Sequence, residues 1–142
     1  MHILIDTNIL FSALICEGNE RLLIEKAAAQ GHTVIVTDLI IEEIQCAVDR
    51  KLPQSKSRKA RSVLKLILNK KQIHLKTAEQ YFRLIAKARK YINKKDAPIL
   101  AAGLQKEIDA IVSGDSDFIK NPKLSFLRKE KIFTTKEALN TL

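Results

Sequence analysis

The chain has 142 residues, 46% of them hydrophobic, and a net charge of +9. This size and composition are typical of one globular domain, expected to span residues 1–142. No apolar run approaches the roughly 20 residues of a membrane span, and no secretory signal precedes the first strand, so a cytoplasmic location is expected. Cys16 and Cys46 are too few for a disulfide scaffold and are expected to be buried thiols.

The pattern of apolar residues predicts alternating strands and helices. In chain order, we expect a strand at 3–5, helices at 8–16 and 20–30, a strand at 32–36, and helices at 39–50 and 58–69. Residues 52–55 form the clearest loop. A strand at 72–75, helices at 78–91 and 96–106, strands at 109–112 and 131–133, and a helix from 135 complete the chain. This alternation predicts an α/β fold with a central parallel sheet between helices.

Local signals define several of these elements. Gly31 stands where a left-handed C-cap would end a helix, and Thr37 or Asp38 is expected to cap the next one. The helix over 78–91 is expected to bury three apolar side chains, those of Phe82, Ile85 and Ala88.

The positive charge is concentrated in one segment. Residues 50–95 contain 16 of the 25 Lys and Arg residues but a single acid, Glu79. Such a polarised surface is typical of proteins that bind a phosphate backbone, although a solvated, solubilising helix face would have the same composition. The candidate nucleic-acid contacts are four cations of this segment: Arg83, Lys87, Lys94 and Lys95.

Acidic side chains follow two of the predicted strands. Asp6 follows the first strand, and Asp115 and Asp117 follow the fourth, after Gly114, which is expected to allow a tight turn. The carboxyl ends of parallel strands share one edge of the sheet, so these acids would meet if the two strands are neighbours. Structural roles remain open, because Asp6 could cap a helix and residues 113–117 could form an Asx-rich turn.

Two further acids are candidates for the same edge. Helical periodicity places Glu42 opposite the buried face of its helix and Glu43 at the border of that face, although either could be an ordinary surface residue. Asp96 begins a helix with Pro98 in its first turn. An N-cap role for Asp96 competes with a role in a site where Lys94 and Lys95 bind phosphate.

Several carboxylates at one place would repel one another and require a cation. Oxygen ligands without His or Cys suit Mg²⁺ or Mn²⁺. His2, His32 and His74 show no ligand spacing, so zinc is not expected. The chain has no P-loop, dinucleotide fingerprint or nucleophile elbow. An acidic metal pocket within a basic surface is what metal-assisted phosphodiester cleavage requires.

In their order and spacing, these motifs resemble PIN-domain ribonucleases, and most closely the VapC-like toxins of prokaryotic toxin–antitoxin modules. The resemblance rests on the acids that open or follow four elements, with their neighbours: Asp6-Thr7-Asn8, Glu43, Asp96-Ala97-Pro98 and Ser113-Gly114-Asp115-Ser116-Asp117. It covers nearly the whole chain. It implies a three-layer α/β/α domain with the strand order 3-2-1-4-5, which would place the fourth strand beside the first.

The resemblance also implies function. It implies an endoribonuclease dependent on Mg²⁺ or Mn²⁺, in which metal-activated water cleaves RNA and leaves 5′-phosphate and 3′-hydroxyl ends. The main metal ligands would be Asp6, Asp96 and Asp115, with Asp117 joining them and Glu43 completing the catalytic acids. Hydroxyl and amide groups would position these acids: those of Thr7, Asn8 and Ser113. A homodimer and an inhibitory antitoxin are the implied partners.

Two other functions remain open at the level of sequence. The same chemistry could serve RNA maturation or decay rather than toxicity. Alternatively, the chain could be a non-catalytic nucleic-acid-binding module, in which basic helices bind the polymer and the acids hold a structural ion.

Overall fold

A five-stranded parallel sheet forms the centre of the computed structural model, which describes all 142 residues. The strands are β1 (His2–Ile5), β2 (Thr33–Thr37), β3 (Ile73–Lys76), β4 (Ala110–Val112) and β5 (Ile132–Phe133). They lie in the order β3-β2-β1-β4-β5, which confirms the predicted fold class and strand order. Branched apolar side chains fill the central strands because both faces of such a sheet are covered.

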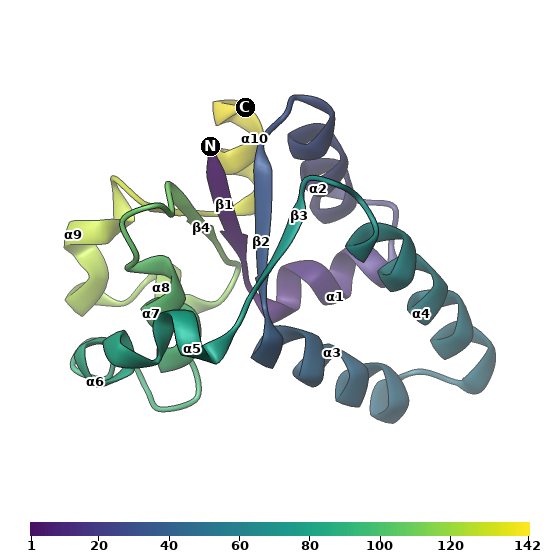
Figure 1. Cartoon of the computed structure of the whole chain (residues 1–142), viewed down its shortest axis with the longest axis horizontal. Coiled ribbons are helices and arrows are strands. Elements are labelled where there is room, and N and C mark those ends of the chain that lie inside the picture. The colour runs from purple at the N-terminus through teal and green to yellow at the C-terminus, as the bar shows by residue number, and fades with distance from the viewer.

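Helices flank the sheet on both sides (Figure 1). On one side lie α1 (Thr7–Ile15), α2 (Asn19–Ala29), α3 (Asp38–Lys51) and α4 (Gln54–Leu68), and α10 (Thr135–Thr141) packs against α2. On the other lie α5 (Ala78–Tyr81), α6 (Ile85–Ala88), α7 (Ala97–Gly103), α8 (Ser116–Ile119) and α9 (Ser125–Arg128). Short 3₁₀ turns, η1 (Phe82–Leu84) and η2 (Pro122–Leu124), complete the elements. None of the helices has the length and apolar composition that crossing a membrane requires.

Polar residues at the ends of β1 and β2 start the next helices. The Ile9 amide donates to Asp6 Oδ1 at 3.1 Å, and the Ile40 amide donates to Thr37 Oγ1 at 3.1 Å. Thr37 is therefore the cap of α3. Gly31, with a φ of 79°, has the left-handed conformation predicted after α2. As a result, α1 and α3 both begin at the edge of the sheet where the strands end.

The single helix predicted over residues 78–91 is wrong. The segment is divided into α5, η1 and α6, and the tighter 3₁₀ turn rotates the side chains that follow it. Tyr81 is 1% exposed, whereas Phe82, which was expected to be buried, is 55% exposed. Ala88 is buried as predicted, and Ile85 is half-buried. An interaction across the sequence anchors Tyr81, because its hydroxyl donates to Asp38 Oδ1 at 2.6 Å.

Other boundaries also differ from the prediction. The helix α4 begins at Gln54, inside the expected loop, because Pro53 has the fixed φ that suits the residue before a helix. The helix α7 ends at Gly103, three residues early. Both cysteines are exposed, not buried: Cys16 follows the last residue of α1, and Cys46 lies on the side of α3 away from Ile44.

Replacing Tyr81 with Phe is expected to lower the free energy of unfolding by about 1.5–3 kcal/mol at pH 7, because a hydrogen bond to a charged carboxylate is lost. Burial alone would raise the pKa of Asp38, but hydrogen bonds from Tyr81 and from the Ala78 and Leu39 amides lower that pKa below its usual value. A lowered folded-state pKa contributes stability above the unfolded-state pKa, and this stability is lost as the pH falls through the folded-state value.

Urea unfolding of Tyr81→Phe and of the wild type at pH 7 and at about pH 3 measures this effect. The difference between the two proteins should shrink at the lower pH. Tyr91→Phe is the matched control, because the Tyr91 ring packs against Phe126 and its hydroxyl makes no hydrogen bond. Equal losses from Tyr81→Phe and Tyr91→Phe would contradict the assignment.

Candidate metal centre

A cavity of about 850 Å³ opens at the edge of the sheet where the strands end. It is lined by the start of α1, by one side of α3, by the start of α7 and by the turn after β4. Four of the five acids that the sequence singled out line it: Asp6, Glu43, Asp96 and Asp115. Segments more than 100 residues apart thus deliver carboxylates to one place, because β1 and β4 are neighbours.

Three aspartates form the tightest cluster. Asp96, Asp115 and Asp117 each place one carboxylate oxygen so that all three lie within 4.8 Å of one another. Asp96 is buried at the start of α7, whereas Asp115 and Asp117 follow β4 and are half-buried and exposed, respectively. The Asx turn considered for residues 113–117 is present as well, because Asp115 Oδ1 accepts from the Asp117 amide at 2.9 Å.

Asp6 lies beside this cluster and has two structural partners. Its side chain is buried, with 3% exposure. One oxygen caps α1, and the other accepts a hydrogen bond from the Ser113 hydroxyl. Ser113 Oγ in turn accepts from the Asp115 amide at 3.0 Å, so this serine connects the acids of β1 and β4. The expected main ligands were Asp6, Asp96 and Asp115. In the closest trio, Asp117 takes the place of Asp6, although Asp6 lines the cavity together with Asp96 and Asp115.

Asn93 is a residue of this site that the sequence reasoning missed. Its Nδ2 donates to Asp96 Oδ2 at 2.8 Å and to Asp117 Oδ2 at 3.1 Å, and its Oδ1 accepts from the Asp96 amide at 3.0 Å. The Asp96 side chain makes no capping bond to its own helix, against the structural alternative considered for it. The sequence did contain one signal for this contact, because Asn93 stands three residues before Asp96, and an Asn side chain at this spacing can bond to groups at the start of a helix.

The electrostatics of the site favour a cation. Burial raises the pKa of Asp6, and the charge of Asp115 adds to this effect while hydrogen bonds from Ser113 and Ile9 oppose it. Burial likewise raises the pKa of Asp96, with further increases from Asp115 and Asp117 and opposition from Asn93 and Lys95. Raised pKa values mean that ionised carboxylates destabilise this region near neutral pH. An oxygen-only donor set of this kind fits Mg²⁺ or Mn²⁺.

Glu43 and its neighbours line the same cavity. Glu43 Oε2 accepts from the Thr7 hydroxyl at 2.9 Å and is half-buried, whereas Glu42 is exposed, as helical periodicity predicted. Glu42 nevertheless lines the cavity as well. Asn8 is an exposed residue of the cavity wall. Gly114 was expected to be needed for a tight turn. The turn does not require glycine, because the φ of Gly114 is not positive and an added Cβ would meet nothing within 4 Å.

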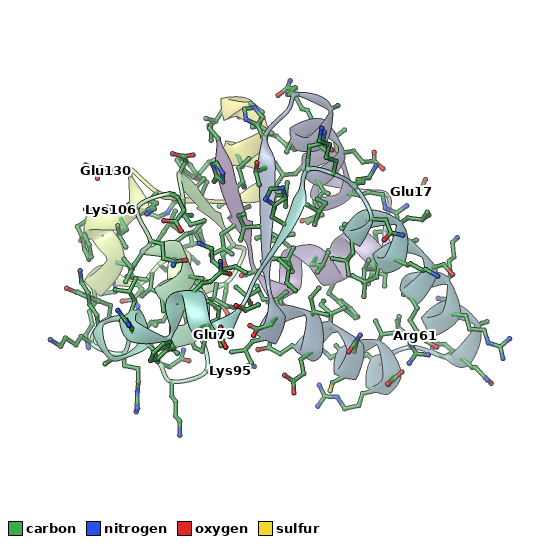
Figure 2. All side chains as sticks on the ribbon, in the orientation of Figure 1. Glu17, Arg61, Glu79, Lys95, Lys106 and Glu130 are labelled. Carbon is green, nitrogen blue, oxygen red and sulfur yellow. The ribbon has the colours of Figure 1, made fainter.

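The cations around the cavity differ from the predicted set. Lys95 lines the cavity, and Figure 2 shows it below the strand ends. Lys94, Arg83 and Lys87 are exposed and lie outside the lining. Arg50 and Lys51 line the other end, and the sequence reasoning did not single them out. They follow Glu43 by seven and eight residues, a helical spacing that places them on the same side of α3.

Comparison with known families agrees with this geometry. A family model described as PIN domain matches residues 4–135. The chain belongs to the PIN domain family. The family predicted from the acidic motifs is thus confirmed. No curated protein matches the chain.

Solved structures of PIN-like fold resemble this PIN domain over most of its length. A chain in the crystal structure of VapBC2 from Rickettsia felis bound to a DNA fragment from their promoter matches with a TM-score of 0.70 and 16% identity, covering 94% of this chain and 98% of that one. A chain in the crystal structure of FitAcB from Neisseria gonorrhoeae matches with a TM-score of 0.67 and 18% identity, with the same coverage. At such identities, the likeness is one of fold.

Proposed function

We propose that this PIN domain is a divalent-metal-dependent endoribonuclease. The observation that carries the proposal is the convergence of carboxylates from β1, α3, α7 and the turn after β4 in one cavity that also contains unpaired Lys and Arg side chains. Acids in such proximity call for a divalent cation, and cations at the rim suit a polyanionic substrate. The net charge of +9 favours the same partner.

Each side chain of the cavity has a proposed role. Four aspartates would hold Mg²⁺ or Mn²⁺: Asp6, Asp96, Asp115 and Asp117. When bound, the ion would lower the pKa of a water molecule and stabilise negative charge on the phosphate. Glu43, oriented by Thr7, would accept a proton from the attacking water, with Asn8 beside it in the wall.

Two neighbouring groups would keep the acids in place. Ser113 fixes Asp6 relative to Asp115, and Asn93 fixes Asp96 relative to Asp117. Lys94 and Lys95 would bind RNA phosphate next to the acids, with Arg83 and Lys87 as more distant contacts.

The test is cleavage of a panel of structured and unstructured RNAs by the wild-type protein with Mn²⁺, with Mg²⁺ and with excess chelator. We expect cleavage with either metal, products with 5′-phosphate and 3′-hydroxyl ends, and no cleavage in chelator. Binding without cleavage across the whole panel would favour the non-catalytic module instead.

We further propose that this nuclease is the toxin of a toxin–antitoxin module, acts as a cytoplasmic homodimer and is inhibited by an antitoxin protein. The resemblance of its motifs to VapC-like toxins and the fold it shares with chains of VapBC2 and FitAcB support this role. Induced expression should arrest growth, and co-expression of a small neighbouring reading frame should restore it. An active nuclease that leaves growth unchanged would point to RNA maturation or decay.

A further inference from the structure

The cavity extends along α3 well beyond the acids. The residues of α3 that line it run from Leu39 to Lys51. At a rise of 1.5 Å per residue, this wall is about 18 Å long. One end is acidic, with Glu43 near the aspartates, and the other end has two adjacent cations, Arg50 and Lys51. The cavity is thus polarised along the helix.

The charges of Arg50 and Lys51 are not neutralised by the protein. Asp49, their neighbour in the cavity wall, forms an ion pair with Arg61 of α4, which Figure 2 shows next to α3. Arg50 and Lys51 form no ion pair. The Lys51 ammonium lies 5.5 Å from the centre of the Phe11 ring, an arrangement that holds its side chain against α1.

We propose that Arg50 and Lys51 bind a phosphate of the RNA strand within about three nucleotides of the bond that is cut. This inference rests on the proposed nuclease function. Glu43 and Arg50 are seven residues apart on α3, which is about 10 Å along the helix. A stacked nucleic-acid strand advances about 3.4 Å per nucleotide and an extended single strand advances further, so this separation corresponds to at most about three nucleotides.

Arg50 and Lys51 are positioning residues under this proposal, because they hold the backbone at a distance from the reacting atoms. Such a contact is made equally in the ground state and in the transition state, so it affects KM and leaves kcat nearly unchanged. The plain structural alternative is that both cations only complement the negative end of the α3 dipole. That alternative predicts a change in stability and no change in RNA binding.

The first measurement is RNA binding without catalysis. In chelator, Arg50→Gln/Lys51→Gln should bind a labelled single-stranded RNA of 12 nucleotides about tenfold more weakly than the wild type at ~0.1 M salt. The slope of log affinity against log salt should decrease by about 0.7, because the variant loses one phosphate contact and each such contact on a single strand contributes about 0.7. Arg50→Lys/Lys51→Arg, which keeps both charges, should restore most of the binding.

The matched control removes two positive charges elsewhere. Lys106 and Lys129 are exposed, and Figure 2 shows Lys106 far from Lys95 and the strand ends. Lys106→Gln/Lys129→Gln should bind RNA nearly as the wild type does. Equal effects of the two double variants would overturn the proposal, because they would reflect net charge alone.

The second measurement uses substrate length. With an RNA that extends six nucleotides to each side of the cut, Arg50→Gln/Lys51→Gln should raise KM about tenfold and keep kcat within twofold. With an RNA that extends only one nucleotide to each side, the variant and the wild type should have the same KM. A change that is equal for both RNAs, or one confined to kcat, would overturn the proposal.

Different results would contradict the nuclease function and the RNA contact proposed for Arg50 and Lys51. A wild-type protein that cleaves no RNA overturns the nuclease function, but the binding measurement contains no metal and still decides whether Arg50 and Lys51 contact RNA. Conversely, full cleavage with unchanged binding by Arg50→Gln/Lys51→Gln overturns this inference and leaves the nuclease function intact.

Discussion

Replacement of Asp115 with Asn is expected to reduce RNA cleavage by more than about a hundredfold while leaving the metal-free protein as stable as the wild type. Loss of a group that only orients a metal ligand costs about 10- to 100-fold in metal affinity or activity, and a carboxylate within the closest acidic trio should cost more. The fold should survive because the Asn oxygen can still accept from the Asp117 amide, as the Asp115 oxygen does. Removing one charge also relieves the repulsion from Asp115 that adds to burial in raising the pKa values of Asp6 and Asp96.

Thermal unfolding separates this effect from misfolding. Mn²⁺ at about 100 times its dissociation constant should stabilise the wild type by about 2.7 kcal/mol, and the same concentration should stabilise Asp115→Asn much less. Glu130→Gln, at an exposed position remote from the cavity, is the control and should respond to Mn²⁺ as the wild type does. Full cleavage by Asp115→Asn, or a wild-type unfolding temperature that does not respond to Mn²⁺, would exclude the proposed metal site.

Replacement of Gly103 with Val should destabilise the fold by about 3 kcal/mol, the largest effect on stability that we expect from one residue. Gly103 ends α7 where this helix packs on β1 and β4. An added Cβ would lie 2.5 Å from Ile111 Cγ1 and 3.4 Å from Leu4 Cδ2, and both of these side chains are fully buried. Overpacking a closed core costs about 1–3 kcal/mol or more, and the better helix propensity of a residue other than Gly offsets only part of it.

Urea unfolding of Gly103→Val and Gly114→Val compares the same substitution at two sites. At Gly114, which is exposed, an added Cβ meets nothing within 4 Å, so the free energy of unfolding should change by less than about 1 kcal/mol. Because Asp96 directly precedes α7, Gly103→Val should also weaken the stabilisation by Mn²⁺. A Gly103→Val protein as stable as Gly114→Val would show that α7 can move away from the sheet at little cost.

The fold and most of the acidic site could be predicted because they depend on local patterns of the sequence. Buried strands such as residues 3–5 are continuous apolar runs, and an acid directly after such a run must lie at the carboxyl edge of a parallel sheet. The spacing on α3 likewise predicted an exposed Glu42 and a partly buried Glu43, and their exposures agree, although both line the cavity. The neighbouring positions of β1 and β4, however, came from the family resemblance, because strand order depends on long-range packing.

What could not be predicted depends on contacts between distant segments. The bond from Tyr81 to Asp38 anchors the end of α5, and nothing near Tyr81 in the sequence signals that partner. The spacing of Asn93 before Asp96 signals a contact with that acid alone, and only the structure shows that Asn93 also binds Asp117. Cys46 is exposed because its side of α3 faces a cavity, whereas most cysteines without a partner are buried.

Asp6 has both a structural role and a proposed role in the metal site, and this limits which mutations can inactivate the protein without unfolding it. Its carboxylate starts the first helix and ties β1 to β4 through Ser113, so most changes at this position would damage folding and chemistry together. Asp117 is exposed, and its side chain has a single partner, Asn93. Inactive but well-folded descendants of this chain should therefore first show substitutions after β4, while the aspartate after β1 is retained.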